Sequence, residues 1–386
     1  MTEPAGTAAP ASASAPAASP AASPAAAASA EPPLLVRREG AITRITMNRP
    51  RAINAFNREM ADAMCAALAE AARDGSTAVL LDGAGERGFC GGGDVKLLSS
   101  DPVVGLEFLR REYEADYAVG SSPVPVVGIM HGITMGGGIG LTGHAALRVV
   151  TETSVLAMPE VRIGIAPDVG GHLLLARAPG RLGELLAITA GSMTAGDAIA
   201  LGFADRLVPS ERIAALADRL ASGESPARVV EGLASTPPAA PLAAAREWFD
   251  PIAEAALGDA GSVMADPAAA AVRLLAELEA SDRAEARAAA ETARGMNPVS
   301  IAVTLAQLAR TRALGLDLAA VLGDDLRVLG RMIGHPNFVE GVRAQLVDKD
   351  SSPRWTPARV EDVDAAEVAA ILDPRDLPGE RPLVLG

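Results

Sequence analysis

Aromatic residues, cysteines and long apolar runs are all scarce in this chain of 386 residues. Phe, Trp and Tyr make up only 3% of it, yet 49% of its residues are hydrophobic, so Ala, Leu and Val must fill the core. This composition favours helices packed closely on a sheet. No run of about 18 uncharged apolar residues occurs, and a membrane-spanning helix is therefore not expected.

The two cysteines, Cys65 and Cys90, are too few for a disulfide scaffold. Neither belongs to a CxxC or Cys/His pattern, and the four histidines are scattered along the sequence, so no metal site is expected. We expect both cysteines to be buried free thiols, which pack as small hydrophobic residues.

Acidic residues outnumber basic ones, 48 to 34, and the formal net charge is −14. Nucleic-acid phosphates and anionic membrane surfaces repel such a chain, so neither is expected as a partner. A small phosphate-bearing ligand stays compatible with this charge, because a few local arginines and backbone N–H groups suffice to hold one.

The chain divides by composition into four ranges. Residues 1–32 are rich in Ala, Pro and Ser, which predicts a disordered tail. They lack the features of a secretory signal and the Arg of a mitochondrial presequence, so the cytoplasm is the default location. Residues 33–235 alternate strands, glycine turns and helices, the pattern of an α/β core. An Ala-rich helical insertion is expected at 236–292, and a C-terminal helical region with a tail at 293–386.

Two glycine clusters, at 91–93 and 136–138, each follow a strand-like run and precede a helical one. Bare backbone at such a turn lets N–H groups approach a ligand, and the start of a helix adds positive potential. Two N–H groups aimed at one point form an oxyanion hole, where each contributes roughly 3 kcal/mol to stabilising a transition state. The same sequences also fit plain tight turns, so both interpretations stay open.

Other glycine-rich sites fit the sequence less well. The GxxxxGK[ST] pattern of a P-loop is absent, and so is the GxSxG nucleophile elbow. Residues 138–143, GIGLTG, match the dinucleotide pattern GxGxxG, which expects an acidic residue about 20 positions later in a βαβ unit. Glu160 lies near that distance, but two predicted strands and a proline intervene, so dinucleotide binding is disfavoured.

Two acidic residues lie in the segment MPEVRIGIAPDVGG: Glu160, beside Pro159, and Asp168, before two glycines. A carboxyl group at the mouth of an apolar pocket has a raised pKa and can act as a base or nucleophile at neutral pH. The alternatives are a surface position for Glu160 and a helix cap for Asp168. Spacing alone does not decide between them.

These residues lie in longer motifs that resemble the crotonase superfamily of enoyl-CoA hydratases and isomerases, and within it the 3-hydroxyisobutyryl-CoA hydrolase branch. The motifs are NRPRAINAFNREM, GFCGGGDVKLL, REYEADYAVGSSPVPVVGIMHGITMGGGIGL, LAMPEVRIGIAPDVGG and HPNFVEGVRAQLVDKDSSPRWTPARVEDV. They belong to the ranges 34–235 and 293–365, and the last one separates this branch from ordinary hydratases. The resemblance implies an α/β fold of the crotonase (ClpP/crotonase-like) type, a spiral of ββα units with a C-terminal helical region.

The resemblance also implies a site. The N–H groups of Gly93 and Gly137 would hold the oxygen of a CoA thioester, and Glu160 would be the catalytic carboxylate. Asp168 would contact the hydroxyl end of the substrate or orient water, and Glu112 would be a further glutamate in contact with the substrate. The neighbouring residues that we assign to substrate binding are Gly92, Asp94 and Gly136.

Two positions depart from the relatives that the chain resembles. Hydratases carry a second glutamate three residues after the oxyanion glycine, where this chain has Gly140. Hydration of a double bond uses two carboxylates to hold one water, so the missing one disfavours a hydratase. After PDVGG the family often has a small residue and an aromatic one, where this chain has His172 and Leu173, and this change is expected to reshape the acyl pocket.

The implied activity is hydrolysis of a short 3-hydroxyacyl-CoA, above all 3-hydroxyisobutyryl-CoA, to 3-hydroxyisobutyrate and CoA in valine catabolism. Glu160 would either attack the thioester to give an anhydride or activate water, and the sequence leaves both routes open. No metal or other cofactor is implied, because CoA arrives with the acyl-CoA substrate. The family also implies a homo-oligomer, a trimer or a hexamer. An enoyl-CoA isomerase, another crotonase-type lyase and a non-catalytic CoA-binding role remain alternatives.

Overall fold

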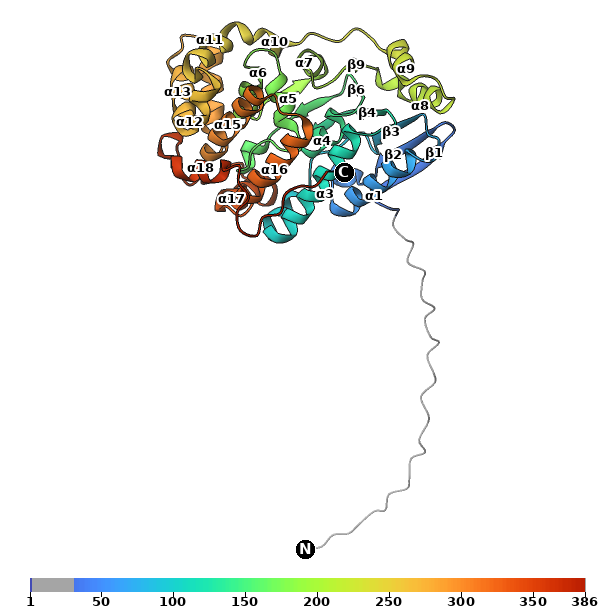
Figure 1. Cartoon of the computed structure of the whole chain (residues 1–386), viewed down its shortest axis with the longest axis horizontal. Helices are drawn as coiled ribbons and strands as arrows, with labels where there is room; N and C mark the ends of the chain where they lie inside the picture. Colours follow the sequence, from blue (N-terminus) through green and yellow to red (C-terminus); the bar gives the residue numbers. More distant parts are fainter. Residues whose placement is uncertain (2–30, 386) are drawn as a thin grey trace. The chain divides into compact units, whose positions relative to one another are not determined.

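The central sheet has six strands in the order β1-β2-β3-β4-β6-β9 (Figure 1). A smaller sheet has the order β5-β7-β8. The computed structural model describes Met1 and residues 31–385, so the predicted tail, 1–32, lies almost wholly outside the described residues. In the central sheet, β1 and β2 pair antiparallel and all other neighbours pair parallel. The strands are β1 (Leu34–Glu39), β2 (Ile42–Met47), β3 (Ala78–Gly83), β4 (Val126–Met130), β5 (Ile133–Met135), β6 (Leu147–Val150), β7 (Val155–Ala157), β8 (Ser192–Thr194) and β9 (Arg206–Leu207).

Helices cover both faces of the central sheet and then continue toward the C-terminus (Figure 1). Among the residues that the structure describes, no helix is long and apolar enough to cross a membrane. The helices are α1 (Arg58–Ala71), α2 (Val95–Ser100), α3 (Pro102–Gly120), α4 (Gly137–Gly143), α5 (Gly171–Arg177), α6 (Leu182–Thr189), α7 (Ala195–Ala200), α8 (Ile213–Ala221), α9 (Pro226–Leu233), α10 (Pro241–Ala244), α11 (Arg246–Leu257), α12 (Ala260–Ala265), α13 (Pro267–Ala280), α14 (Ala284–Arg294), α15 (Pro298–Leu314), α16 (Leu318–Met332), α17 (Pro336–Val342) and α18 (Ala365–Leu372). Short 3-10 turns span Pro50–Ala52 (η1), Glu160–Ile163 (η2), Ser210–Arg212 (η3) and Val360–Asp362 (η5), and a π-helix spans Arg343–Val347 (η4).

The strand β3 is buried on both faces, as its continuous apolar run predicts. Val79 and Leu81 belong to the larger apolar cluster, together with side chains of α1 and α3. Leu80, which points the opposite way, belongs to a second cluster that includes side chains of α8 and α9. The sheet is therefore the middle layer of three, and the α/β expectation is confirmed.

The smaller sheet brings the glycine turn at 136–138 beside the Met-Pro-Glu motif. β5 and β7 pair in parallel, with Met135 opposite Ala157. The N–H of Gly136 then donates to the carbonyl oxygen of Ala157, at 3.1 Å. Because both strands end at the same edge, the chain leaves them side by side, and η2 with Glu160 starts next to α4.

The Ala-rich residues 236–292 form the helices α10 to α14 (Figure 1). Alanines of α13 and α14 are fully buried, and their single methyl groups let the helices pack closely around Phe249 and Leu274. The described residues from 32 onward form one compact unit. The predicted boundaries near 235 and 292 stay predictions about the sequence.

The burial of Leu274 predicts that α13 is part of the main core. Leu274→Ala should lower the free energy of unfolding by about 2–5 kcal/mol, because it leaves a cavity under α13. Chemical denaturation followed by circular dichroism measures this loss, and one cooperative transition is expected.

Glu277, on the exposed side of the same helix, supplies the matched control. Glu277→Ala should change the free energy of unfolding by no more than about 0.5 kcal/mol. Equal effects of the two substitutions, or a separate early transition for the helical region, would show that α13 does not share the main core.

Candidate active site

A cavity of about 240 Å³ lies where the ends of β5 and β7 meet α3 and the π-helix. Its wall is mostly apolar, with a few acidic side chains and bare glycine backbone, which is the usual make-up of a small-molecule site. The structure brings seven of the eight sequence-predicted residues into this wall. They are Gly92, Gly93, Glu112, Gly136, Gly137, Glu160 and Asp168.

The backbone N–H groups of Gly93 and Gly137 lie close together in this wall. The carbonyl oxygen of Gly92 accepts from the N–H of Phe56, and the N–H of Asp94 donates to the carbonyl oxygen of Phe56. The N–H of Gly93, which lies between these two groups, therefore points away from Phe56. Gly137 is the first residue of α4, where an N–H has no acceptor within the helix. A Cβ on Gly137 would lie 3.2 Å from the nitrogen of Gly93, so the two amides are neighbours. This arrangement has the form of an oxyanion hole.

Glycine is required at 136 and 137 because two carboxyl groups lie against the turn. Gly136 has φ 49°, and a Cβ there would lie 2.8 Å from Oε1 of Glu160. A Cβ on Gly137 would overlap Oε1 of Glu112. The same contacts place both carboxyl groups within reach of any atom that the two amides bind.

Glu160 is buried, with 5% of its surface exposed, so the alternative of a surface position is wrong. Burial raises the pKa of Glu160 well above its ordinary value, and the nearby Asp168 adds to this effect. Within the described part of the chain, its Oε2 atom has no hydrogen-bond partner. A free carboxyl oxygen at an apolar cavity is suited to attack or to proton transfer.

Asp168 is also buried, and it does not cap a helix, because Gly170 is the N-cap of α5. The hydroxyl of Tyr113 donates to Oδ2 of Asp168 at 2.6 Å and fixes its orientation. Burial and the neighbouring Asp325 raise the pKa of Asp168 to about 7. Asp168 therefore changes charge near neutral pH.

The helix α3 presents three polar side chains, Glu112, Tyr113 and Asp116, to the interior, each no more than 2% exposed. Burial raises the pKa of both carboxyl groups, and each also responds to the charge of Asp168. Sequence reasoning missed Tyr113 and Asp116. The available signal was their spacing, because Asp116 lies one turn after Glu112 and continues the buried face of Phe108 and Leu109.

Two expectations from the sequence concern residues that do not line the cavity. Asp94 does not line the cavity, since its side chain lies 3.6 Å from Arg49 in an ion pair, and its role in substrate binding stays a prediction. His172 and Leu173 do not line the cavity either, so a direct effect on the acyl pocket is wrong. His172 lies behind the wall, where its Nε2 is 2.9 Å from Oδ1 of Asp325.

The C-terminal π-helix supplies Gln345 and Leu346 to the cavity wall, and η2 supplies Arg162. Arg162 is exposed at this position, and no described carboxylate forms an ion pair with it. It is the one cationic side chain in the wall, and it is suited to an anionic group at the cavity.

Cys90 is a buried free thiol, as expected, and Cys65 is a half-buried one. Burial raises the pKa of Cys90 to about 12, so it packs in the turn rather than acting as a nucleophile. Among the residues described by the structure, no cluster of three or more His, Cys, Asp or Glu is arranged to hold a metal ion.

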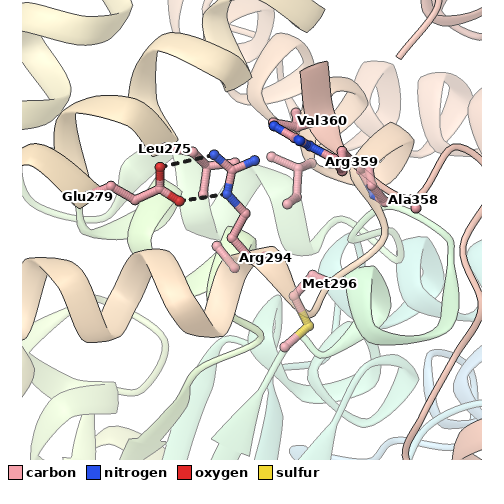
Figure 2. A pocket seen from close by; sticks show the side chains of 10 residues that line it. Leu275, Glu279, Arg294, Met296, Ala358, Arg359 and Val360 are labelled. Carbon is pink, nitrogen blue, oxygen red and sulfur yellow. Dashed lines mark hydrogen bonds and ion pairs between the residues drawn. The ribbon is translucent and has the colours of Figure 1, made fainter. Parts of the chain in front are cut away.

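A second cavity of about 400 Å³ lies among the C-terminal helices and is shown in Figure 2. Its central charge, Arg294, pairs with Glu279 at 2.7 Å and with Glu361 at 2.8 Å. Arg359 also pairs with Glu361. Because these charges are paired with each other, this cavity is the weaker candidate for a reaction.

The raised pKa of Glu160 predicts how its removal changes stability with pH. The unfolded chain loses this proton near pH 4.5, whereas the folded chain keeps it to higher pH, so the group makes unfolding easier as pH rises above 4.5. Glu160→Gln removes this contribution. The melting temperature of the variant should therefore rise relative to that of the wild type as pH increases above 4.5, until the folded-state pKa of Glu160 is passed, by an amount equivalent to about 1.4 kcal/mol per pKa unit.

Thermal unfolding at several pH values measures this difference. Glu277→Gln, on an exposed surface, should leave the difference from wild type constant over the same range. A constant difference for Glu160→Gln as well would mean that Glu160 ionises normally in the folded chain.

Comparisons with known proteins identify the family of the chain. A family model described as enoyl-CoA hydratase/isomerase matches residues 42–372. Proteins named mitochondrial 3-hydroxyisobutyryl-CoA hydrolase are similar to the chain. The one from Dictyostelium discoideum is 31% identical over 356 residues, 88% of this chain and 91% of the relative. The one from Homo sapiens is 33% identical over 345 residues, 86% of each.

Two solved structures are similar along nearly their whole length. One, titled a carnitinyl-CoA dehydratase from Mycobacterium thermoresistibile, has a TM-score of 0.82 and 37% identity and covers 91% of this chain and 98% of its own. Another, titled an enoyl-CoA hydratase from Rhodobacter sphaeroides 2.4.1, has a TM-score of 0.79 and 36% identity, with 89% and 98% covered. The chain therefore belongs to the enoyl-CoA hydratase/isomerase family and has the crotonase fold.

Proposed function

We propose that the protein hydrolyses a short 3-hydroxyacyl-CoA thioester, 3-hydroxyisobutyryl-CoA, to 3-hydroxyisobutyrate and CoA. The observation that carries this proposal is the free, buried carboxyl of Glu160 beside the paired amides of Gly93 and Gly137. The names of the similar proteins from Dictyostelium discoideum and Homo sapiens support the same acyl group.

The proposed reaction follows from the atom on which negative charge develops, the oxygen of the thioester. The two amides donate to the thioester oxygen, which becomes negative when a nucleophile adds to the carbonyl carbon. The ionised Glu160 either adds directly, giving a mixed anhydride that water then cleaves, or takes a proton from the water that adds. Along either route one water is consumed, the C–S bond breaks, and the sulfur leaves as the CoA thiol once it has gained a proton.

The acidic groups around Glu160 can also bind the substrate. Asp168, oriented by Tyr113, and Glu112 from α3 face the same cavity and can accept a hydrogen bond from the 3-hydroxyl of the acyl group. Gly92 and Gly136 let the backbone approach the substrate closely. Arg162 is the cation that can contact the anionic part of CoA.

Hydration is the main competing reaction, because two solved relatives carry dehydratase or hydratase titles. The second glutamate of the hydratases falls at Gly140 in this chain. A Cβ there would lie 2.6 Å from Cβ of Val169 and 2.9 Å from Oδ1 of Asp116, so no side chain fits. The chain therefore lacks the glutamate that hydratases carry at this position, which favours hydrolysis over addition of water to a double bond.

Several finer properties belong to the same proposal. We place the reaction in valine catabolism, with acyl-CoA as the partner and no cofactor besides the CoA of the substrate. A trimer or hexamer is expected from the family. The cytoplasm stays the predicted location of this chain, although the similar proteins are named mitochondrial.

Release of free thiol tests the reaction. The wild type should release CoA from 3-hydroxyisobutyryl-CoA, and Glu160→Gln should lower kcat by roughly 10²–10⁴-fold, because it removes the nucleophile or base. Glu277→Gln is the control and should keep wild-type activity. No thiol release from a folded wild type, together with a change in double-bond absorbance on crotonyl-CoA or a 3-enoyl-CoA, would instead establish hydratase or isomerase chemistry.

The oxyanion hole has its own test. Gly137→Ala should lower kcat by roughly 10²–10³-fold, because the new methyl group overlaps Glu112 and displaces the amide from its place. Gly334→Ala is the matched control, since nothing lies within 4 Å of its added methyl group. Steady-state thiol release by the two folded variants measures the effect, and equal kcat values would remove Gly137 from the site.

A further inference from the structure

The turn that carries Asp168 has an unfavourable backbone. Val169 has φ 52° and Gly170 has φ 73°, both in the left-handed region. A β-branched residue such as valine rarely adopts this conformation, because its side chain clashes with the backbone. The carbonyl oxygen of Asp168 accepts from the N–H of Gly171 at 2.6 Å, which closes the turn. Such a turn persists only where other contacts hold it.

One carboxylate from the C-terminal helices makes these contacts. Oδ2 of Asp325, on α16, accepts from the N–H of Gly170 at 2.9 Å. Its Oδ1 lies 2.9 Å from Nε2 of His172, on α5. Nδ1 of His172 in turn lies 3.0 Å from the hydroxyl of Thr311, on α15. Asp325 and His172 are fully buried, so water does not replace either contact.

The charges around this turn come from every element packed on it. Asp325 raises the pKa of Asp168, whereas His172 lowers it to a smaller extent. Asp325 in turn raises the pKa of His172 and so favours the charged imidazole. The other titratable groups nearby are Glu112, Tyr113 and Asp116 on α3, Glu160 on η2, Asp324 on α16 and Arg310 on α15, which pairs with Asp324. His144, at the end of α4, also lies against Gly170, and burial lowers its pKa to about 4, so its ring is neutral at neutral pH.

We propose that Asp325 is a positioning residue for the hydrolysis proposed above. It fixes the strained turn at Gly170, binds His172 from the other side, and so holds the Asp168 carboxyl against Tyr113 and the cavity. Asp325 lies 155 positions after Gly170 and does not line the cavity. The helix α16 thereby becomes part of what orders the acyl-binding side of the site.

Two substitutions separate the geometry from the charge. In Asp325→Asn, the side-chain oxygen can still accept from Gly170 and the amide can donate to a neutral His172, so the turn is kept and the charge is lost. Asp325→Leu removes both. Asp218→Asn, on the exposed side of α8, is the control for an Asp→Asn change.

The measurements are the pH profile of thiol release and the titration of the Asp168 carboxyl by carbon NMR, assigned with Asp168→Asn. Asp325→Asn should keep its plateau kcat within about threefold of wild type, while the limb due to Asp168 and its NMR titration both move to lower pH. The imidazole nitrogen signals of His172 should become those of a neutral ring. Asp325→Leu, if folded, should lose about 100-fold in kcat, because Asp168 is no longer held in place.

The outcomes distinguish this inference from the proposed reaction. If the wild type releases no thiol but the Asp168 titration of folded Asp325→Leu differs from that of Asp325→Asn, the reaction is wrong and the positioning role stands, because the two variants share the loss of charge and differ in the turn contacts. If thiol is released and Asp325→Leu keeps both the kcat and the Asp168 titration of Asp325→Asn, the positioning role is overturned. Should Asp325→Leu fail to fold, Asp325→Ala, which removes the same contacts with a smaller side chain, is measured in its place.

Discussion

The parallel pairing of β5 with β7 is the constraint on which the site depends. Its register places Met135 opposite Ala157, so the glycine turn and the Met-Pro-Glu motif leave the sheet together. A slip by one residue would move one relative to the other by about 3.3 Å. The space between them allows no such slip, because a single methyl group on Gly136 would already come within 2.8 Å of Glu160. Backbone hydrogen bonding therefore sets how far the amide donors lie from the backbone that carries the carboxylate.

That register concentrates acidic groups in a chain that is already acidic. Glu112, Asp116, Glu160, Asp168 and Asp325 are all buried near one cavity, and among the described residues the fully buried side chain beside them that becomes a cation when protonated is His172. Burial of so many like charges is unfavourable, and the site responds by holding protons. The buried carboxyl groups thus lower the stability of the free protein, while their raised pKa values suit them to acid–base chemistry. Such a conflict is common in active sites. A substrate that brings a positive or hydrogen-donating group relieves part of this cost.

The sequence predicts the parts of the site that are local in the chain. Glu160 and Asp168 follow a strand within one short motif, Gly137 begins α4, and Gly93 directly precedes the N-cap of α2, so spacing and resemblance together identify them. The partners Tyr113 and Asp325 join Asp168 and Gly170 from 55 and 155 positions away, and only the packing of α3 and α16 brings them there. Asp94 shows that a neighbouring position in the sequence does not ensure a place in the site. It adjoins Gly93 in sequence, but the chain turns into α2 at this point and directs its side chain to Arg49.

The C-terminal motif that marks the hydrolase branch acquires a physical meaning from the π-helix at Arg343–Val347. Arg343 pairs with Glu340 at 2.8 Å on one side and with Asp348 and Asp350 on the other, at 2.8 and 2.7 Å. Each pair is partly exposed and contributes little alone, but together they tie the segments before and after the π-helix to one guanidinium. A π-helix is rare and is often found at functional sites, because it projects side chains that an α-helix would direct elsewhere. Here it carries Gln345 and Leu346 into the cavity wall, and a chain that ended with the α/β core would lack this wall. One side of the cavity is therefore built by the C-terminal helices, and another by the smaller sheet and the turns that follow its strands.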